Sequence, residues 1–281
     1  MKNIQRSFLS VLIVALALSL TACSGKEASE VRTKSTAVTQ ESSVNDTNSK
    51  ETAVNNSVTT KTDAEIKAAF TYSIIDEAYT EDGIIIKFPQ LTKASDPQKA
   101  DAVNKAIQDD IKKELDSLKN GMEDMELFSL DLKYDLAGYS NKVLSISYQG
   151  TSNFEKAAYP VNVYHTQNIV LDDVSNLPLK DIITIDSFFV GQFKSGMYSP
   201  TNEDLNLEKE GVNLKEVIEG QYSDAELISL FQKEDANYKL TKAGIILSVE
   251  VPHAIGDHLE MTINYELIKG NMIKSSPVWK D

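Results

Sequence analysis

The stretch DPQKADAVNKAIQDDIKKELDSLKNG, residues 96–121, decides how the middle of this chain folds. Asp96 is a residue type that caps helices, and Pro97 fits the first helical turn, where a missing N–H costs nothing. Apolar residues then recur every three or four positions, at Val103, Ile107, Ile111, Leu115 and Leu118. This spacing predicts an amphipathic helix whose apolar stripe faces a core. Asn120-Gly121 predicts its end.

Strands are predicted on both sides of this helix. Before it, residues 70–75 and 83–88 read as two strands joined by the hairpin turn Glu81-Asp82-Gly83. After it, residues 128–134 and 143–148 alternate between polar and apolar side chains, with a turn predicted at 138–141. The helix is therefore expected to cover a largely antiparallel sheet.

The second half of the chain continues the mixture of strands and short helices. Asp186 is expected to cap a helix that stops at Gly196, and Ser223 with Glu226 forms a capping box before another. Residues 198–210 read as a polar loop. Further strands are expected at 161–171, 237–240, 245–251, 260–265 and 272–278. The fold class is therefore predicted as α+β, with mainly antiparallel sheets and a few packed helices after a disordered N-terminal tether.

The N-terminus has the pattern of a secretory signal. Lys2 and Arg6 precede an apolar run at 8–20, which is too short for a comfortable membrane-spanning helix of about 20 residues. Leu20-Thr21-Ala22-Cys23 resembles the lipobox of bacterial lipoproteins. The resemblance implies cleavage after Ala22 and a lipid on Cys23, the only cysteine of the chain. We therefore expect a lipid anchor in the cell membrane, with the rest of the chain on the extracytoplasmic face.

A polar tether is predicted to follow the anchor. Between Cys23 and about residue 63, Ser, Thr, Asn, Lys and Glu dominate and aromatic residues are missing, so this segment cannot bury a core. The predicted organisation is a signal peptide at 1–22, a lipidated disordered tether at 23–63, and two α+β subdomains at 64–155 and 156–281.

The charge of the chain restricts its partners. The net charge is −14, from 28 basic and 42 acidic residues, and removal of residues 1–22, which hold two basic residues and no acid, leaves 26 − 42 = −16. Such a surface repels nucleic acid and anionic lipid, so neither is expected as a general ligand. It attracts basic partners, most strongly at low salt.

Few residues carry recognisable chemistry. The sequence has no Gly-x-Ser-x-Gly elbow, P-loop or dinucleotide-binding glycine pattern, so we expect no catalytic residues and no cofactor. Asp172-Asp173 is interpreted as a solvated turn. His253 and His258 share a polar hairpin loop without the spacing of a zinc motif, so no metal is expected. The candidates for a binding surface are Tyr159, His165, His253 and His258.

Five local patterns, taken in order, resemble a bacterial extracytoplasmic domain of unknown function. The family occurs in lysozyme-sensing anti-sigma factors and in the non-catalytic N-terminal part of secreted peptidoglycan deacetylases. The matching segments are Ile84–Leu91, Asp101–Ile107, Ile169–Ile182 with its Leu-Lys-Asp step, Tyr238–Ile245 and Ile263–Leu267. One departure is Lys156–Pro160, where the family often has a Gly-Gly-Ala-His segment and this chain has neither the glycines nor the histidine.

The resemblance implies a binding or sensing role in the cell envelope. The expected partner is a basic protein such as a lysozyme, or a peptidoglycan strand of the wall. Two alternatives stay open: a hydrolase acting on cell-wall polymers, and a structural lipoprotein without a small ligand. A hydrolase would need a His/carboxylate cluster converging in a cleft.

Overall fold

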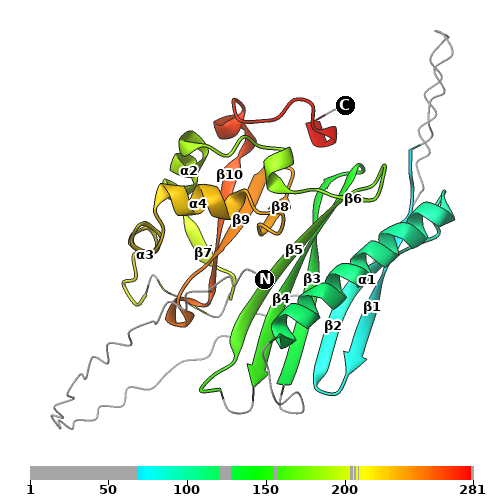
Figure 1. Cartoon of the computed structure of the whole chain (residues 1–281), viewed down its shortest axis with the longest axis horizontal. Helices are drawn as coiled ribbons and strands as arrows, with labels where there is room; N and C mark the ends of the chain where they lie inside the picture. The colour runs from blue at the N-terminus through cyan, green and yellow to red at the C-terminus, as the bar shows by residue number, and fades with distance from the viewer. Residues whose placement is uncertain are drawn as a thin grey trace, which may run out of the picture. The chain divides into compact units, whose positions relative to one another are not determined.

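The computed structural model describes residues 69–120, 128–154, 157–202, 205, 207 and 209–279. These residues form two sheets and four helices, which confirms the predicted α+β class (Figure 1). The first sheet comprises β1 (Ser73–Glu81), β2 (Ile84–Thr92), β3 (Phe128–Ser140), β4 (Val143–Phe154), β5 (Val161–Val170) and β6 (Ser175–Asn176), in that order. Its pairs are antiparallel except for β2 with β3, which are parallel.

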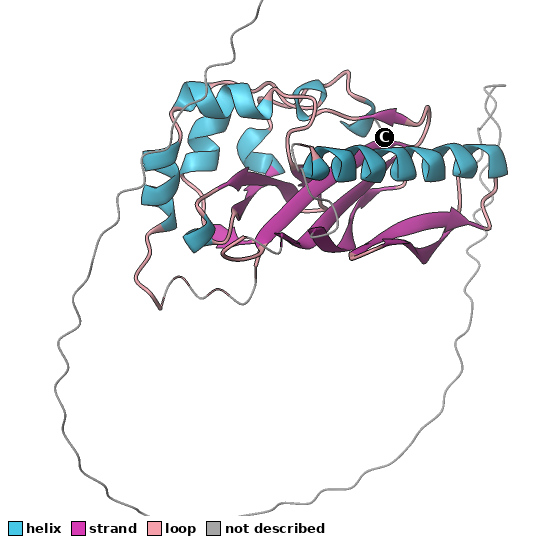
Figure 2. Ribbon diagram, turned by 60° about the horizontal axis from the view of Figure 1, so that its bottom comes forward, coloured by secondary structure: helices cyan, strands magenta, loops and turns pink. Residues whose placement is uncertain are grey.

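The first core lies between this sheet and helix α1 (Pro97–Lys119). Asp96 caps the helix by accepting a hydrogen bond from the N–H of Lys99 at 3.0 Å. Of the predicted stripe, Val103, Ile107, Ile111 and Leu115 are buried, and Leu118 packs at its margin. Figure 2 shows α1 lying along one face of the strands. The capped amphipathic helix and its core-facing stripe are confirmed.

The second core belongs to a four-stranded sheet covered by three short helices (Figure 2). Its strands, in the order β7–β10–β9–β8, are β7 (Tyr198–Pro200), β10 (His258–Asn264), β9 (Gly244–Glu250) and β8 (Tyr238–Leu240). The helices are α2 (Ser187–Lys194), α3 (Leu214–Gln221) and α4 (Asp224–Phe231). The caps predicted at Asp186 and Ser223 are both present, the latter as a capping box with Glu226.

Three local predictions are wrong. Strand β3 continues past Gly138 to Ser140, because a bulge between Ala137 and Ser140 keeps it paired with β4, so the turn lies at 141–142. The segment 198–210 is not wholly loop, since β7 pairs with β10. Residues 272–278 make a single bridge, from Met272 to Ile183, and no strand. Helix α3 was not predicted, although Asn213 caps it.

The two sheets meet through polar side chains on strands β4 and β5. The edge strand β8 would otherwise expose backbone groups, and the first sheet supplies their partners. Asn168 Nδ2 donates to the carbonyl of Tyr238 at 2.9 Å, and the Tyr238 N–H donates to Thr166 Oγ1 at 3.0 Å. The Leu240 N–H donates to Ser145 Oγ at 3.0 Å. We call Ser145, Thr166 and Asn168, with these backbone groups of β8, the polar seam.

The predicted subdomain boundary lies within the described part of the chain, whereas the predicted N-terminal features do not. The position 155/156 falls between β4 and β5, which pair from Val143↔Val170 to Ser152↔Val161. The signal peptide at 1–22, Cys23 and the tether at 23–63 lie outside the described residues, as do Gly121 and Lys156. No helix among the described residues is long and apolar enough to span a membrane.

The polar seam can be tested by shortening one of its side chains. Asn168→Ala leaves the buried carbonyl of Tyr238 without its donor, so the free energy of unfolding should fall by about 1–3 kcal/mol. Urea unfolding followed by circular dichroism measures this. The control Asn153→Ala changes an exposed residue of β4 and should cost no more than about 0.5 kcal/mol. Equal losses for both variants would show that the seam does not stabilise the fold.

Candidate functional site

Along residues 161–167, one edge of β5 pairs with no strand among the described residues. Antiparallel pairing directs the backbone groups of alternate residues to opposite sides of a strand. The Leu171 N–H bonds to Lys142 next to β4, whereas the Asn168 carbonyl accepts from Leu177 on the other side. The backbone groups of Asn162 and Tyr164 therefore face away from β4. Side chains take part of this edge: Asp257 Oδ2 accepts the Asn162 N–H at 2.8 Å, and Asn237 Nδ2 donates to the Tyr164 carbonyl at 3.4 Å.

A groove of about 640 Å³ runs beside this edge of β5. Its walls come from α1, the segment before β8, β9 and the start of β10. The acidic residues that line it are Asp110, Glu114, Asp235, Glu250 and Asp257. The lysines that line it are Lys113 and Lys233. We call this hollow the acidic groove, since its carboxylates outnumber its lysines by five to two.

His165 links β5 to α1 at the floor of the acidic groove. Its Nε2 lies 2.6 Å from Asp110 Oδ2 and its Nδ1 lies 3.6 Å from Glu114 Oε2, so one carboxylate faces each ring nitrogen. Burial disfavours the charged imidazolium, but the hydrogen bond to Asp110 and the charges of Asp110 and Glu114 outweigh it. The pKa of His165 is therefore raised above its ordinary value.

Tyr159 and His253 form a stacked pair at one end of the groove. Their ring centroids are 4.8 Å apart with an interplanar angle of 11°. The Nδ1 atom of His253 lies 3.0 Å from Asp257 Oδ2, and the same carboxylate oxygen accepts the Asn162 side-chain N–H at 3.0 Å. Tyr159 is 61% exposed, which leaves a large aromatic surface open to a partner.

His258 and Tyr164 lie against each other where the groove meets the second sheet. Their ring centroids are 5.8 Å apart. Burial lowers the pKa of His258, and its Nδ1 atom has no hydrogen-bond partner among the described residues. Burial, together with the neighbouring carboxylate of Glu260, raises the pKa of Tyr164. Both side chains are therefore neutral near pH 7.

The structure brings the four candidates of the sequence analysis to one region. His165 and His258 line the acidic groove directly, and Tyr159 and His253 are tied to it through Asp257. The sequence analysis missed the acids of α1, although Asp110 and Glu114 stand four residues apart on one helix face. It also missed Asp235 and Glu250, whose placement depends on how β8 and β9 approach β5.

The paired acids Asp172-Asp173 lie in the turn between β5 and β6. Asp173 Oδ1 accepts the N–H of Ser175 at 3.0 Å and its hydroxyl at 2.6 Å, as in an Asx turn. These hydrogen bonds lower the pKa of Asp173. The described residues hold no group of three or more His, Cys, Asp or Glu side chains placed to bind a metal ion.

Comparison with known proteins finds similarity to two solved structures. No protein-family model matches the sequence, and no curated protein matches it. A solved structure of a DUF3298 family member from Bacteroides fragilis is 16% identical, with a TM-score of 0.43, and the match covers 75% of this chain and 95% of that one. A DUF3298 family protein from Pseudomonas aeruginosa is 13% identical, with a TM-score of 0.42 and the same coverages. The printed names of both neighbours place them in a family of domains of unknown function.

The environment of His165 predicts a pH dependence of stability. Its pKa is higher in the folded chain than the ordinary value of about 6.5, so its contribution is complete below that pH and is lost as the pH rises through the folded value. The substitution His165→Gln should therefore lower the free energy of unfolding by more at pH 6 than at pH 9. Urea titrations at several pH values measure the difference.

The stability that His258 contributes should depend on pH in the opposite direction, so this residue serves as a control. Its pKa is lowered by burial, so its contribution is complete above about pH 6.5 and is lost as the pH falls. The loss caused by His258→Gln should therefore be larger at pH 8 than at pH 5. Losses that do not change with pH for His165→Gln would contradict the contacts to Asp110 and Glu114.

Proposed function

We propose that this chain is a lipid-anchored binding module on the outer side of the cytoplasmic membrane, and that it holds a basic protein in the acidic groove. The observation that carries the proposal is the groove's excess of carboxylates beside an uncovered strand edge. A basic surface would gain from these charges and from the net charge of −14. Lysozyme is the basic protein that the sequence resemblance suggests.

Two of the acidic side chains in the groove are better placed than the others to pair with a basic partner. Asp110 and Glu114 already face His165, and Asp257 faces His253. Asp235 and Glu250 are exposed and have no ion-pair partner among the described residues. Their charges are available to a lysine or arginine of a partner without loss of an existing contact.

Tyr222 adds an aromatic surface to the same wall. Its hydroxyl donates to the backbone carbonyl of Glu250 at 2.8 Å, which fixes the ring beside that carboxylate. Aromatic rings held beside carboxylates suit arginine, because its guanidinium can stack and pair at once. This pairing supports a basic protein rather than a simple cation as the partner.

The N-terminal sequence supports the proposed location outside the membrane. Lys2, Arg6 and the apolar run at 8–20 are typical of a secretory signal, and Cys23 stands where lipoproteins receive their lipid. Each buried lipid CH₂ contributes about 0.8 kcal/mol, so two or more acyl chains would hold the protein firmly. A polar segment at 24–63 would then separate the folded part from the membrane.

The groove can be tested with lysozyme and detergent-solubilised intact protein. The double variant Asp235→Asn/Glu250→Gln should weaken binding about 3- to 10-fold at low salt, because two unscreened attractions are lost. Biolayer interferometry at 20 and 300 mM salt measures the affinity and its salt dependence.

A matched double variant separates the groove from the overall charge. Asp101→Asn/Glu77→Gln also removes two exposed acids, one on α1 and one on β1, but neither lines the groove. It should bind lysozyme almost as the wild type does. No binding by the wild type at 20 mM salt, or equal weakening by both double variants, would refute the proposed site.

The anchor is tested by replacing the acceptor of the lipid. Cys23→Ala should move the protein from the membrane fraction to the soluble extracytoplasmic fraction, because no other cysteine can carry the lipid. Cell fractionation and immunoblotting measure this. The conservative control Ser24→Ala should stay with the membrane. A Cys23→Ala protein that stays with the membrane would show that the anchor is wrong.

A further inference from the structure

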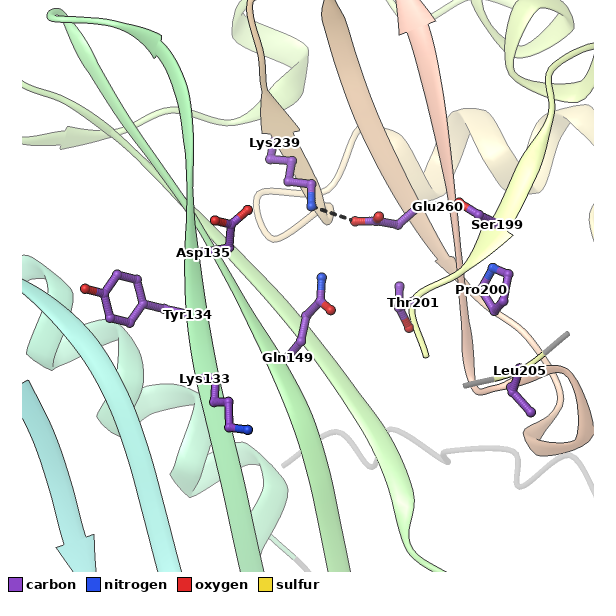
Figure 3. Close-up of a pocket in the computed structure, with 10 residues that line it drawn as sticks. All are labelled: Lys133, Tyr134, Asp135, Gln149, Ser199, Pro200, Thr201, Leu205, Lys239 and Glu260. Atoms are coloured by element: carbon purple, nitrogen blue, oxygen red, sulfur yellow. Dashed lines mark ion pairs between the residues drawn. The ribbon is translucent and has the colours of Figure 1, made fainter. Parts of the chain in front are cut away.

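A second hollow, of about 670 Å³, opens over β3 and β4, on the face of the first sheet opposite α1. Strands from both sheets line it: Lys133 and Asp135 come from β3, Gln149 from β4, Lys239 from β8 and Glu260 from β10 (Figure 3). We call it the mixed-charge cavity. It lies apart from the acidic groove and does not depend on the lipid anchor or on a protein partner.

The cavity wall contains a buried ion pair. Lys239 is 8% exposed, and its ammonium lies 3.1 Å from Glu260 Oε1. Tyr164 Oη donates to the same carboxylate oxygen at 2.5 Å. An ammonium carries three donors and a carboxylate has about four acceptor sites, so neither group is saturated by these contacts. The pair therefore presents donors and acceptors side by side to whatever occupies the cavity.

Two further charges stand on β3 at the mouth of the cavity. Lys133 and Asp135 are two residues apart, so their side chains project from the same face of the strand. Both are exposed, and neither has an ion-pair partner among the described residues. The lining thus holds two positive and two negative side chains, in a chain whose net charge is −14.

The balance of charges in the lining indicates which class of ligand fits the cavity. An anion would be repelled by the chain as a whole, and an uncharged sugar would gain nothing from the charges of β3. Figure 3 also shows the ring of Tyr134 turned away from the other lining residues, so it offers no platform for a sugar. A molecule that carries a carboxylate and an ammonium together can use both signs of charge.

We propose that the mixed-charge cavity binds a small zwitterion of the amino-acid or short-peptide type. Its carboxylate pairs with Lys133 and the spare donors of Lys239. Its ammonium pairs with Asp135 and the spare acceptors of Glu260. Gln149 and the hydroxyl of Thr201 line the same space and can hydrogen-bond the polar atoms between the two charges.

One dipeptide in four forms tests the requirement for both charges. Alanyl-alanine is a zwitterion, its N-acetyl form is an anion, its C-terminal amide is a cation, and the form blocked at both ends is neutral. Isothermal titration calorimetry with the detergent-solubilised intact protein measures each affinity. The zwitterion should bind, and the loss of either charge should weaken binding about tenfold. Equal affinity for the zwitterion and the doubly blocked form, or no binding of any form, would overturn the proposal.

Variants on β3 test which charge of the ligand each residue binds, and they leave the buried Lys239–Glu260 pair unchanged. Lys133→Gln should weaken binding of the zwitterion but leave the C-terminal amide unaffected, because the amide has no carboxylate to lose. Asp135→Asn should weaken the zwitterion but leave the N-acetyl form unaffected. The control Lys87→Gln removes an exposed lysine of β2 outside the cavity and should change none of the four affinities. A Lys133→Gln protein that behaves as Lys87→Gln does would contradict the assignment.

Discussion

The polar seam between the two sheets is the constraint on which the rest of the structure depends. Each sheet has one apolar face, covered by helices, and one face that carries polar side chains. Ser145, Thr166 and Asn168, on the polar face of the first sheet, hydrogen-bond the backbone at the free edge of β8. Buried polar groups are costly unless they are hydrogen-bonded, so the seam fixes the register of β8 against β4 and β5. An apolar contact of the same area would fix it less strictly.

The seam also explains why two hollows remain between the sheets. Side chains fill the contact at Thr166 and Asn168, and towards Asn162 the second sheet reaches β5 through Asp257, His258 and Glu260. Two hollows are left: the acidic groove along the edge of β5, and the mixed-charge cavity over β3 and β4.

The sequence predicts the local elements well and their assembly poorly. The cap at Asp96 and the stripe from Val103 to Leu115 are local patterns, so the helix and its buried face could be read directly. The seam could not, because Ser145 and Thr166 look like ordinary outward positions of alternating strands. Lys239 is a second such case: it stands between two apolar residues, and contact between the sheets buries it. The candidate histidines were found as residue types, while their carboxylate partners depend on packing between distant segments.

The central claim is that the acidic groove beside β5 holds a basic protein, and hydrogen–deuterium exchange with and without lysozyme tests it most directly. The account predicts slower exchange on binding at the C-terminal half of α1 and at residues 230–237 and 248–258, with little change at β1 and β2. Protection confined to segments outside the groove, or no protection at lysozyme concentrations that saturate binding, would contradict it.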